Sequence, residues 1–118
     1  MLPSSTARDR RLRKRSDFLE LRKRGSSRSH PLLVLRSVSN GIDSSRIAVA
    51  VSRRVSPKAV VRNRVRRRLK ESVRQMPVKT GWDLLFTARP AAAKTGFIDL
   101  SEAARRLLSR ANLIRFDR

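Results

Sequence analysis

The sequence predicts an α+β fold, a small α-β sandwich with elements in the order α-β-β-α-β-α. Two segments, residues 57–76 and 96–111, repeat apolar side chains at helical spacing. Two others, residues 46–52 and 82–88, alternate their side chains as strands do. A chain of 118 residues suffices for one domain with a modest core, so we expect helices to cover a single sheet.

The N-terminal part divides into an arm and the start of the domain. Residues 1–15 are polar and basic, with little to bury, so we expect a mobile arm that orders on binding. Residues 16–118 should form the single folded domain. Its first helix should begin at Ser16, a good N-cap residue, and end near Gly25. The segment that follows, as far as His30, is predicted to be a loop.

Two strands should precede the central helix. Leu32-Leu33-Val34-Leu35 starts a strand that runs to about Val38, and the turn-forming cluster 39–45 connects it to the strand at 46–52. This short connection predicts an antiparallel hairpin. In the second strand, branched residues share one face and alanines the other, so one side should be packed by a helix and the other shallow.

The central helix should start at Ser56-Pro57 and end before Pro77. At about 100° per residue, its apolar side chains form one stripe that fits a face laid on a core. This stripe consists of Val61, Val65, Leu69, Val73 and Met76. The opposite, outward face consists of Asn63, Arg67, Lys70 and Arg74. The two edges consist of Arg62 and Arg66 on one side and of Arg64 and Arg68 on the other.

The charge of this helix has one sign. Between Arg53 and Arg74, ten of twenty-two residues are Lys or Arg, and Glu71 is the single acid. A solvated face usually mixes charges, because like charges at i,i+4 destabilise a helix. With a net charge of +21 for the chain, the pattern predicts a polyanionic partner, with nucleic acid first and an anionic membrane surface second.

The C-terminal part should supply a third strand and a last helix. Trp82, Leu84 and Phe86 lie on one face of the strand and are predicted to be core residues. The buried stripe of the last helix is expected to consist of Phe97, Leu100, Ala104, Leu107, Leu108 and Ala111.

Catalytic machinery is not evident in this sequence. The nine acids are scattered, the one histidine (His30) has no evident partner, and there is neither a cysteine nor a Gly-rich phosphate loop. We therefore predict no catalytic residue, no metal site and no cofactor bound by the protein alone. No apolar run approaches membrane-spanning length, so we expect a cytoplasmic protein without a membrane partner.

Phe18 allows two interpretations. It can pack the first helix onto the sheet, which its spacing slightly favours, or it can stack on an unpaired base beside Arg13, Arg15 and Arg22. Five aromatic residues are too few for an extended stacking surface, so phosphate contacts should dominate affinity.

The segment from Arg46 to Glu71 resembles the signature of the bacterial ribonuclease P protein family. The resemblance includes a basic pair (Arg53-Arg54), then Ala59-Val60, then Arg62-Asn63-Arg64 followed by further basic residues and Glu71. It extends to the Asp17-Phe18 pair and to the Trp82 strand with its Leu-rich helix, and so covers residues 16–111. Two departures are Arg53-Arg54 in place of the common Lys-Lys and Leu32-Leu33-Val34-Leu35 where the family's strand often offers an aromatic residue.

The resemblance implies a subunit of the ribonucleoprotein that removes the 5′ leader from precursor tRNA, with RNA-bound magnesium performing the chemistry. It also implies a left-handed β-α-β crossover. Its partners would be the catalytic RNA subunit and precursor tRNA. The predicted RNA-binding residues are Arg53, Arg54, Lys58, Arg62, Asn63, Arg64, Arg66, Arg67, Arg68 and Lys70. The predicted leader-cleft residues are Phe18, Arg13, Arg15, Arg22, Arg46 and Ser52, with Arg53 also bordering the cleft.

Two alternatives remain. A non-catalytic structural RNA-binding protein, such as a ribosomal protein, has the same composition and differs only in the context of Arg62-Asn63-Arg64. A basic amphipathic helix on a membrane surface is weaker, because the apolar stripe lacks aromatic anchors and is needed to cover the sheet.

Overall fold

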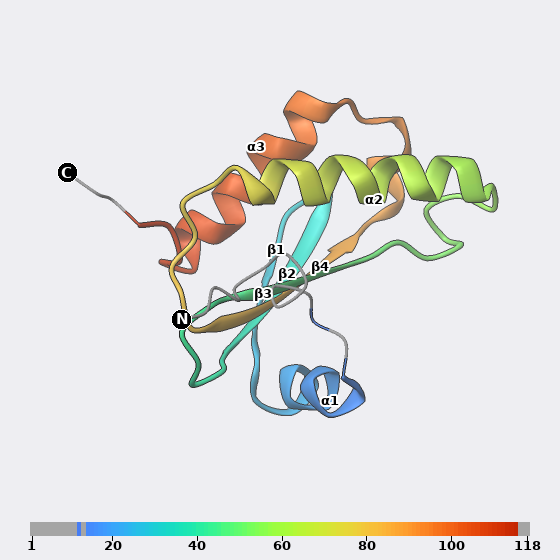
Figure 1. The fold of residues 1–118 in the computed structure, drawn as a ribbon. Coiled ribbons are helices and arrows are strands. Elements are labelled where there is room, and N and C mark those ends of the chain that lie inside the picture. Colours follow the sequence, from blue (N-terminus) through green and yellow to red (C-terminus); the bar gives the residue numbers. More distant parts are fainter. Residues whose placement is uncertain (1–11, 13, 116–118) are drawn as a thin grey trace, which may run out of the picture.

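A computed structural model describes residue 12 and residues 14–115, which form one sheet with helices on both faces (Figure 1). In chain order the helices and strands are α1 (Arg15–Arg24), β1 (Ser26–Ser29), β2 (Leu33–Ser39), β3 (Arg46–Ala50), α2 (Ala59–Arg74), β4 (Trp82–Ala88), the 3₁₀ helix η2 (Pro90–Lys94) and α3 (Phe97–Arg110). The predicted α+β class and the order of its six elements are confirmed. The short strand β1 is an addition, and it occupies the segment predicted to be a loop.

The sheet has the strand order β1-β2-β4-β3, so the predicted hairpin of the two strands before α2 is wrong. β4 lies between them, antiparallel to β2 and parallel to β3. A central strand is covered on both faces, and β4 carries apolar side chains on both, although Asp83 and Thr87 flank Leu85 on the second face. Leu84 and Phe86 are fully buried on one face, and the half-buried Leu85 lies on the other. The largely polar connection between β2 and β3, residues 40–45, passes across the end of β4, which lies between them.

The path β3-α2-β4 joins two neighbouring parallel strands and crosses over in the left-handed sense (Figure 1). Nearly all such connections are right-handed. The implied crossover is therefore present, and it places α2 over the β3–β4 edge of the sheet.

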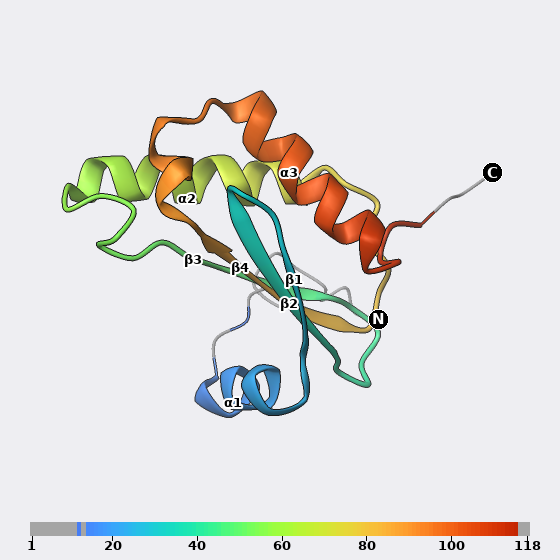
Figure 2. The ribbon, with the colours of Figure 1, turned by 180° about the vertical axis from the view of Figure 1, so that it is seen from behind.

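The two faces of the sheet are covered unequally, as Figure 2 shows from behind. Helices α2 and α3 cover one face and enclose the main core, in which Phe86, Leu69 and Leu107 are fully buried. Helix α1 covers part of the other face through a small cluster around Leu21 and Val38. The predicted asymmetry of the sheet is thus confirmed.

The N-terminal arm is only partly covered by the structure, because residues 1–11 and Arg13 lie outside the described residues. Leu12, which sequence analysis assigned to the arm, is buried against the α1 cluster. Its backbone N–H donates to the carbonyl oxygen of Ile47 at 3.4 Å. At this position the chain already contacts the sheet.

The helix starts differ from the predicted ones by a few residues. Helix α1 begins at Arg15, with Lys14 as its N-cap, and α2 begins at Ala59, with Lys58 as its N-cap. Neither cap makes a side-chain hydrogen bond. The hydroxyl of Ser56 accepts instead from the backbone N–H of Lys58 at 3.1 Å, so it shapes the turn before the helix.

Candidate nucleic-acid interface

The outward face of α2 is cationic, as its periodicity predicts. Asn63, Arg67, Lys70 and Arg74 are exposed. On the opposite face, the side chains of the predicted stripe pack into the main core. Its buried members are Val65, Leu69, Val73 and Met76, with Val61 half-buried beside them.

The arginines along the edges of α2 are half-buried, and three of them anchor neighbouring loops. Arg62 donates to the carbonyl oxygen of Ser56 at 3.0 Å. Across the helix, Arg64 and Arg68 donate to the carbonyl oxygens of Ala93 and Thr95 at 3.2 and 3.0 Å. These side chains therefore carry positive charge at the surface and also fix the segments that flank the helix.

On the same edge as Arg62, Arg66 donates to the amide oxygen of Asn63 at 2.6 Å. This bond holds the two side chains together on the exposed surface of the helix. Both belong to the Arg62-Asn63-Arg64 region that carries the family resemblance, so this part of the surface is partly preorganised.

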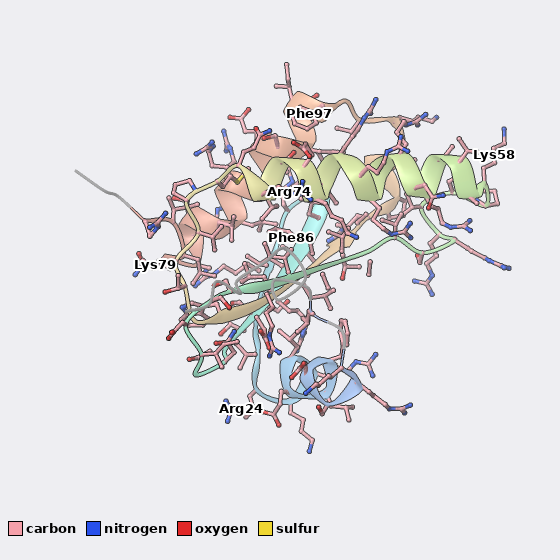
Figure 3. All side chains as sticks on the ribbon, in the orientation of Figure 1. Arg24, Lys58, Arg74, Lys79, Phe86 and Phe97 are labelled. Atoms are coloured by element: carbon pink, nitrogen blue, oxygen red, sulfur yellow. The ribbon has the colours of Figure 1, made fainter. Side chains whose placement is uncertain are left out.

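The loop before α2 adds cations at the N-terminal end of the helix. Ser52, Arg53, Arg54 and Lys58 are all exposed, and Figure 3 shows Lys58 at this end. The backbone N–H of Arg54 donates to the Ser52 hydroxyl at 3.2 Å, and the buried Val55 anchors the turn in the core. The loop thus continues the cationic surface of α2, as the sequence predicted.

Three of the predicted leader-cleft residues, Phe18, Arg15 and Arg22, lie on α1, whereas Ser52 lies in the loop before α2. Phe18 is half-buried against the cluster of Leu12, Leu21 and Val38, so it packs on the sheet side and keeps part of its ring accessible. Arg15 and Arg22 are exposed on the same helix, whereas Arg13 lies outside the described residues. This geometry is compatible with both interpretations of Phe18.

Arg46 is held by two carboxylates that sequence analysis did not connect to it. Its Nε and one terminal nitrogen each donate to an Asp83 carboxylate oxygen at 2.8 Å, and the same terminal nitrogen lies 3.3 Å from Asp17. The hydrogen bonds to Asp83 raise the pKa of Arg46 above its ordinary value. The triad joins α1, β3 and β4, so Arg46 borders the predicted cleft with its charge already compensated.

The signal for this triad was a lone acid in an otherwise apolar strand. Asp83 is 3% exposed, and a buried carboxylate requires a partner. The amide of Asn40 also donates to it at 2.9 Å. The sequence could show that Asp83 needs a cation but not which one.

Arg36 is a cation that the sequence analysis did not single out. From β2 its guanidinium donates to the carbonyl oxygens of Leu21 and Arg22 at 3.1 to 3.3 Å. These carbonyls belong to the last turn of α1, where a helix has unpaired acceptors and favours positive charge. Arg36 therefore fastens the C-terminal end of α1 to the sheet.

His30 accepts a hydrogen bond within the turn between β1 and β2. Its Nδ1 accepts from the backbone N–H of Leu32 at 3.0 Å. Burial, together with the positive charges of Arg106 and Arg110, lowers the pKa of His30. The neutral ring is thus favoured as an acceptor that shapes the turn between β1 and β2.

Residue 12 and residues 14–115 contain neither a group of metal-ligand side chains nor a membrane-spanning helix. In this part, no three His, Cys, Asp or Glu side chains gather in a way that could hold a metal ion. Likewise, none of the described helices is long and apolar enough to cross a membrane.

The fold and the α2 surface define a small α+β protein with a cationic helix of the kind that contacts polyanions. A sequence profile of the family Ribonuclease P matches residues 6–112. This chain therefore belongs to the ribonuclease P protein family, and the resemblance drawn from residues 46–71 is confirmed.

Individual relatives agree with this assignment. The ribonuclease P protein component of Clostridium kluyveri is 38% identical over 107 residues, which cover 87% of this chain and 95% of that protein. The corresponding protein of Dehalococcoides mccartyi is 35% identical over 104 residues, covering 88% and 86%.

Solved structures have the same fold. The RNase P protein from Thermotoga maritima is 31% identical, with a TM-score of 0.77 and coverage of 85% of this chain and 96% of that one. The Staphylococcus aureus RNase P protein is 25% identical, with a TM-score of 0.80 and coverage of 90% and 98%.

Proposed function

We propose that this chain is the protein subunit of the ribonucleoprotein that removes the 5′ leader from precursor tRNA, acting in the cytoplasm. The observation that carries the proposal is the exposed, one-signed face of α2 in a chain of this family. In this proposal α2 and the loop before it bind the catalytic RNA subunit. The α1 face of the sheet binds the single-stranded leader.

Electrostatics suits this division of surfaces. RNA phosphates near a catalytic centre repel each other, and a row of cations reduces this repulsion without any proton transfer. Arginine suits the task, because its planar guanidinium can grip two phosphate oxygens. The protein's own contribution would thus be to bind the RNA, to hold the leader and to lower the local anionic charge.

The chemistry is assigned to RNA-bound magnesium, because the carboxylates among the described residues do not converge on one position that could hold a metal ion. Asp17 and Asp83 are brought together by the fold, but both lie against the guanidinium of Arg46. Glu71 pairs with Arg74 at 3.7 Å, and Glu102 pairs with Arg106 at 3.9 Å. A catalytic ion pair needs several carboxylates that point at one position.

Reconstitution tests the proposal. The protein alone should not cleave precursor tRNA at any magnesium concentration, and added to the RNA subunit it should lower the magnesium requirement for cleavage. Glu102→Gln and Asp99→Asn, which replace exposed acids outside the α2 surface, should leave single-turnover cleavage by the holoenzyme largely unchanged. If either amide abolished the chemical step while RNA binding stayed normal, the protein would have to be counted as a catalyst.

Phe18 is tested by comparing substrates. If its accessible ring stacks on a leader base, Phe18→Ala should weaken precursor binding by about 1–3 kcal/mol and leave mature tRNA affinity nearly unchanged. Leu19→Ala is the matched control, because Leu19 is the next residue of α1 and is 44% exposed. Equal losses on both substrates, or a lower melting temperature without a substrate effect, would assign Phe18 to packing alone.

A further inference from the structure

A surface pocket lies between α2 and the first turn of α3. It has a volume of about 400 Å³, within the ~300–1,000 Å³ range of small-molecule sites. Its lining consists of Arg67, Arg68, Lys70, Glu71, Arg74 and Phe97. Figure 3 labels Phe97 at the start of α3 and Arg74 on the neighbouring α2.

Phe97 is exposed here, although its helical spacing predicted burial. Its side chain is 39% exposed, whereas Leu100, one turn further along α3, is fully buried. The open part of the ring lies beside several cations, so it offers an apolar, aromatic surface next to positive charge. The predicted stripe fails at this residue because the first turn of α3 lies at the rim of the helical layer.

The arginines along one edge of α2 hold the chain segment that leads into α3, and so help to shape the pocket. Arg64 and Arg68, one helical turn apart, hold the backbone at Ala93 and Thr95. This segment leads directly into α3. The two hydrogen bonds therefore fix where α3 begins, and with it the position of the Phe97 ring relative to α2.

The lining has the chemistry of a nucleotide site. It contains four cations and one carboxylate, Glu71, which is held by Gln75 at 3.0 Å and lies 3.7 Å from Arg74. Bases stack on aromatic rings, and cations bind the phosphates that join them. Glu71 adds acceptor oxygens that can meet the amino or imino groups of a base edge.

We propose that this pocket holds one unpaired nucleotide of the RNA partner, with its base stacked on Phe97 and its phosphate on the α2 cations. The inference rests on the proposed function. Arg67, Lys70 and Arg74 belong both to the pocket and to the outward face of α2, so an RNA strand lying along this face passes the mouth of the pocket. An acidic peptide would use the cations but would leave the ring uncovered.

Photo-crosslinking with the full chain tests this inference without the RNA subunit. The probe is a short single-stranded RNA in which 4-thiouridine replaces one base, irradiated in complex with the protein and digested with trypsin. Cleavage after Lys94 and Arg105 releases residues 95–105, which contain Phe97, separately from every α2 peptide. We expect a base adduct on this peptide.

Two variants sharpen the result. Phe97→Leu keeps an apolar side chain but removes the ring, and it should reduce the adduct on residues 95–105 about tenfold, as expected for the loss of one stacked base. Ile98→Ala should leave the adduct unchanged, because Ile98 is 77% exposed and does not line the pocket. Melting temperatures of both variants check that α3 remains folded.

The outcomes separate this inference from the proposed function. The nucleotide pocket is overturned if residues 95–105 carry no adduct, or if the adduct yield is the same in the wild type and in Phe97→Leu. If the protein in that case still binds RNA and still stimulates cleavage by the RNA subunit, the proposed function stands. A protein that binds no RNA at all overturns both.

Discussion

Val65→Asp should unfold the domain, whereas Arg67→Ala, two residues away, should leave it folded. Val65 is fully buried in the main core under α2, and aspartate there would place an unpaired charge among apolar side chains. Such substitutions exceed about 4 kcal/mol, a large part of the ~5–15 kcal/mol that holds a domain together. Thermal unfolding followed by circular dichroism measures the loss.

Arg67→Ala supplies the matched control on the opposite face of the same helix. An exposed substitution of this kind changes stability by at most about 0.5 kcal/mol, but it should weaken assembly with RNA by removing a cation. If Arg67→Ala melted early and Val65→Asp did not, the two faces of α2 would be assigned the wrong way round.

The faces of α2 could be predicted because one helix fixes its own geometry. Side chains at 100° per residue divide into a buried and an exposed side without knowledge of the rest of the fold. The same reasoning failed at the start of α3. Phe97 has the helical spacing of a buried residue but lies at the rim, where only the tertiary arrangement decides what covers it.

Strand pairing was beyond local reasoning, because the partners of a strand need not be its neighbours in sequence. The short connection favoured pairing of β2 with β3, yet β4 arrives from more than thirty residues later and separates them. The useful signal was that residues 82–88 carry a large apolar side chain on each face, with Leu85 on one and Leu84 and Phe86 on the other. A strand of this composition is more stable in the middle of a sheet than at its edge.

The grouping of Arg46 with its two carboxylates could not be predicted from local sequence either. Asp17, Arg46 and Asp83 come from three elements, and only the finished sheet brings them together. Spacing assigned Arg46 to the leader cleft as a cation, and the structure adds that this cation is also a structural tie. The contact with Asp17 links α1 to β3, next to Phe18 in the sequence of α1.

Asp83→Asn should destabilise the protein by about 3 kcal/mol, because it removes the main partner of a largely buried guanidinium. The Asp83 side chain is 4% exposed and that of Arg46 is 21% exposed, so water cannot fully replace the lost carboxylate. Glu102→Gln is the control, since its pair with Arg106 is about 60% exposed and such pairs contribute roughly 0–1 kcal/mol.

Urea unfolding of Asp83→Asn, Arg46→Gln and the double variant measures how the triad is coupled. If Arg46 and Asp83 act as a unit, the double variant should be little less stable than the worse single variant. The double variant contains neither of the two charges, so neither is buried without the other. Additive losses would mean that Asp83 and Arg46 stabilise the sheet independently. The remaining Asp17 would then be the group that holds Arg46, and α1 should stay docked when Asp83 is replaced.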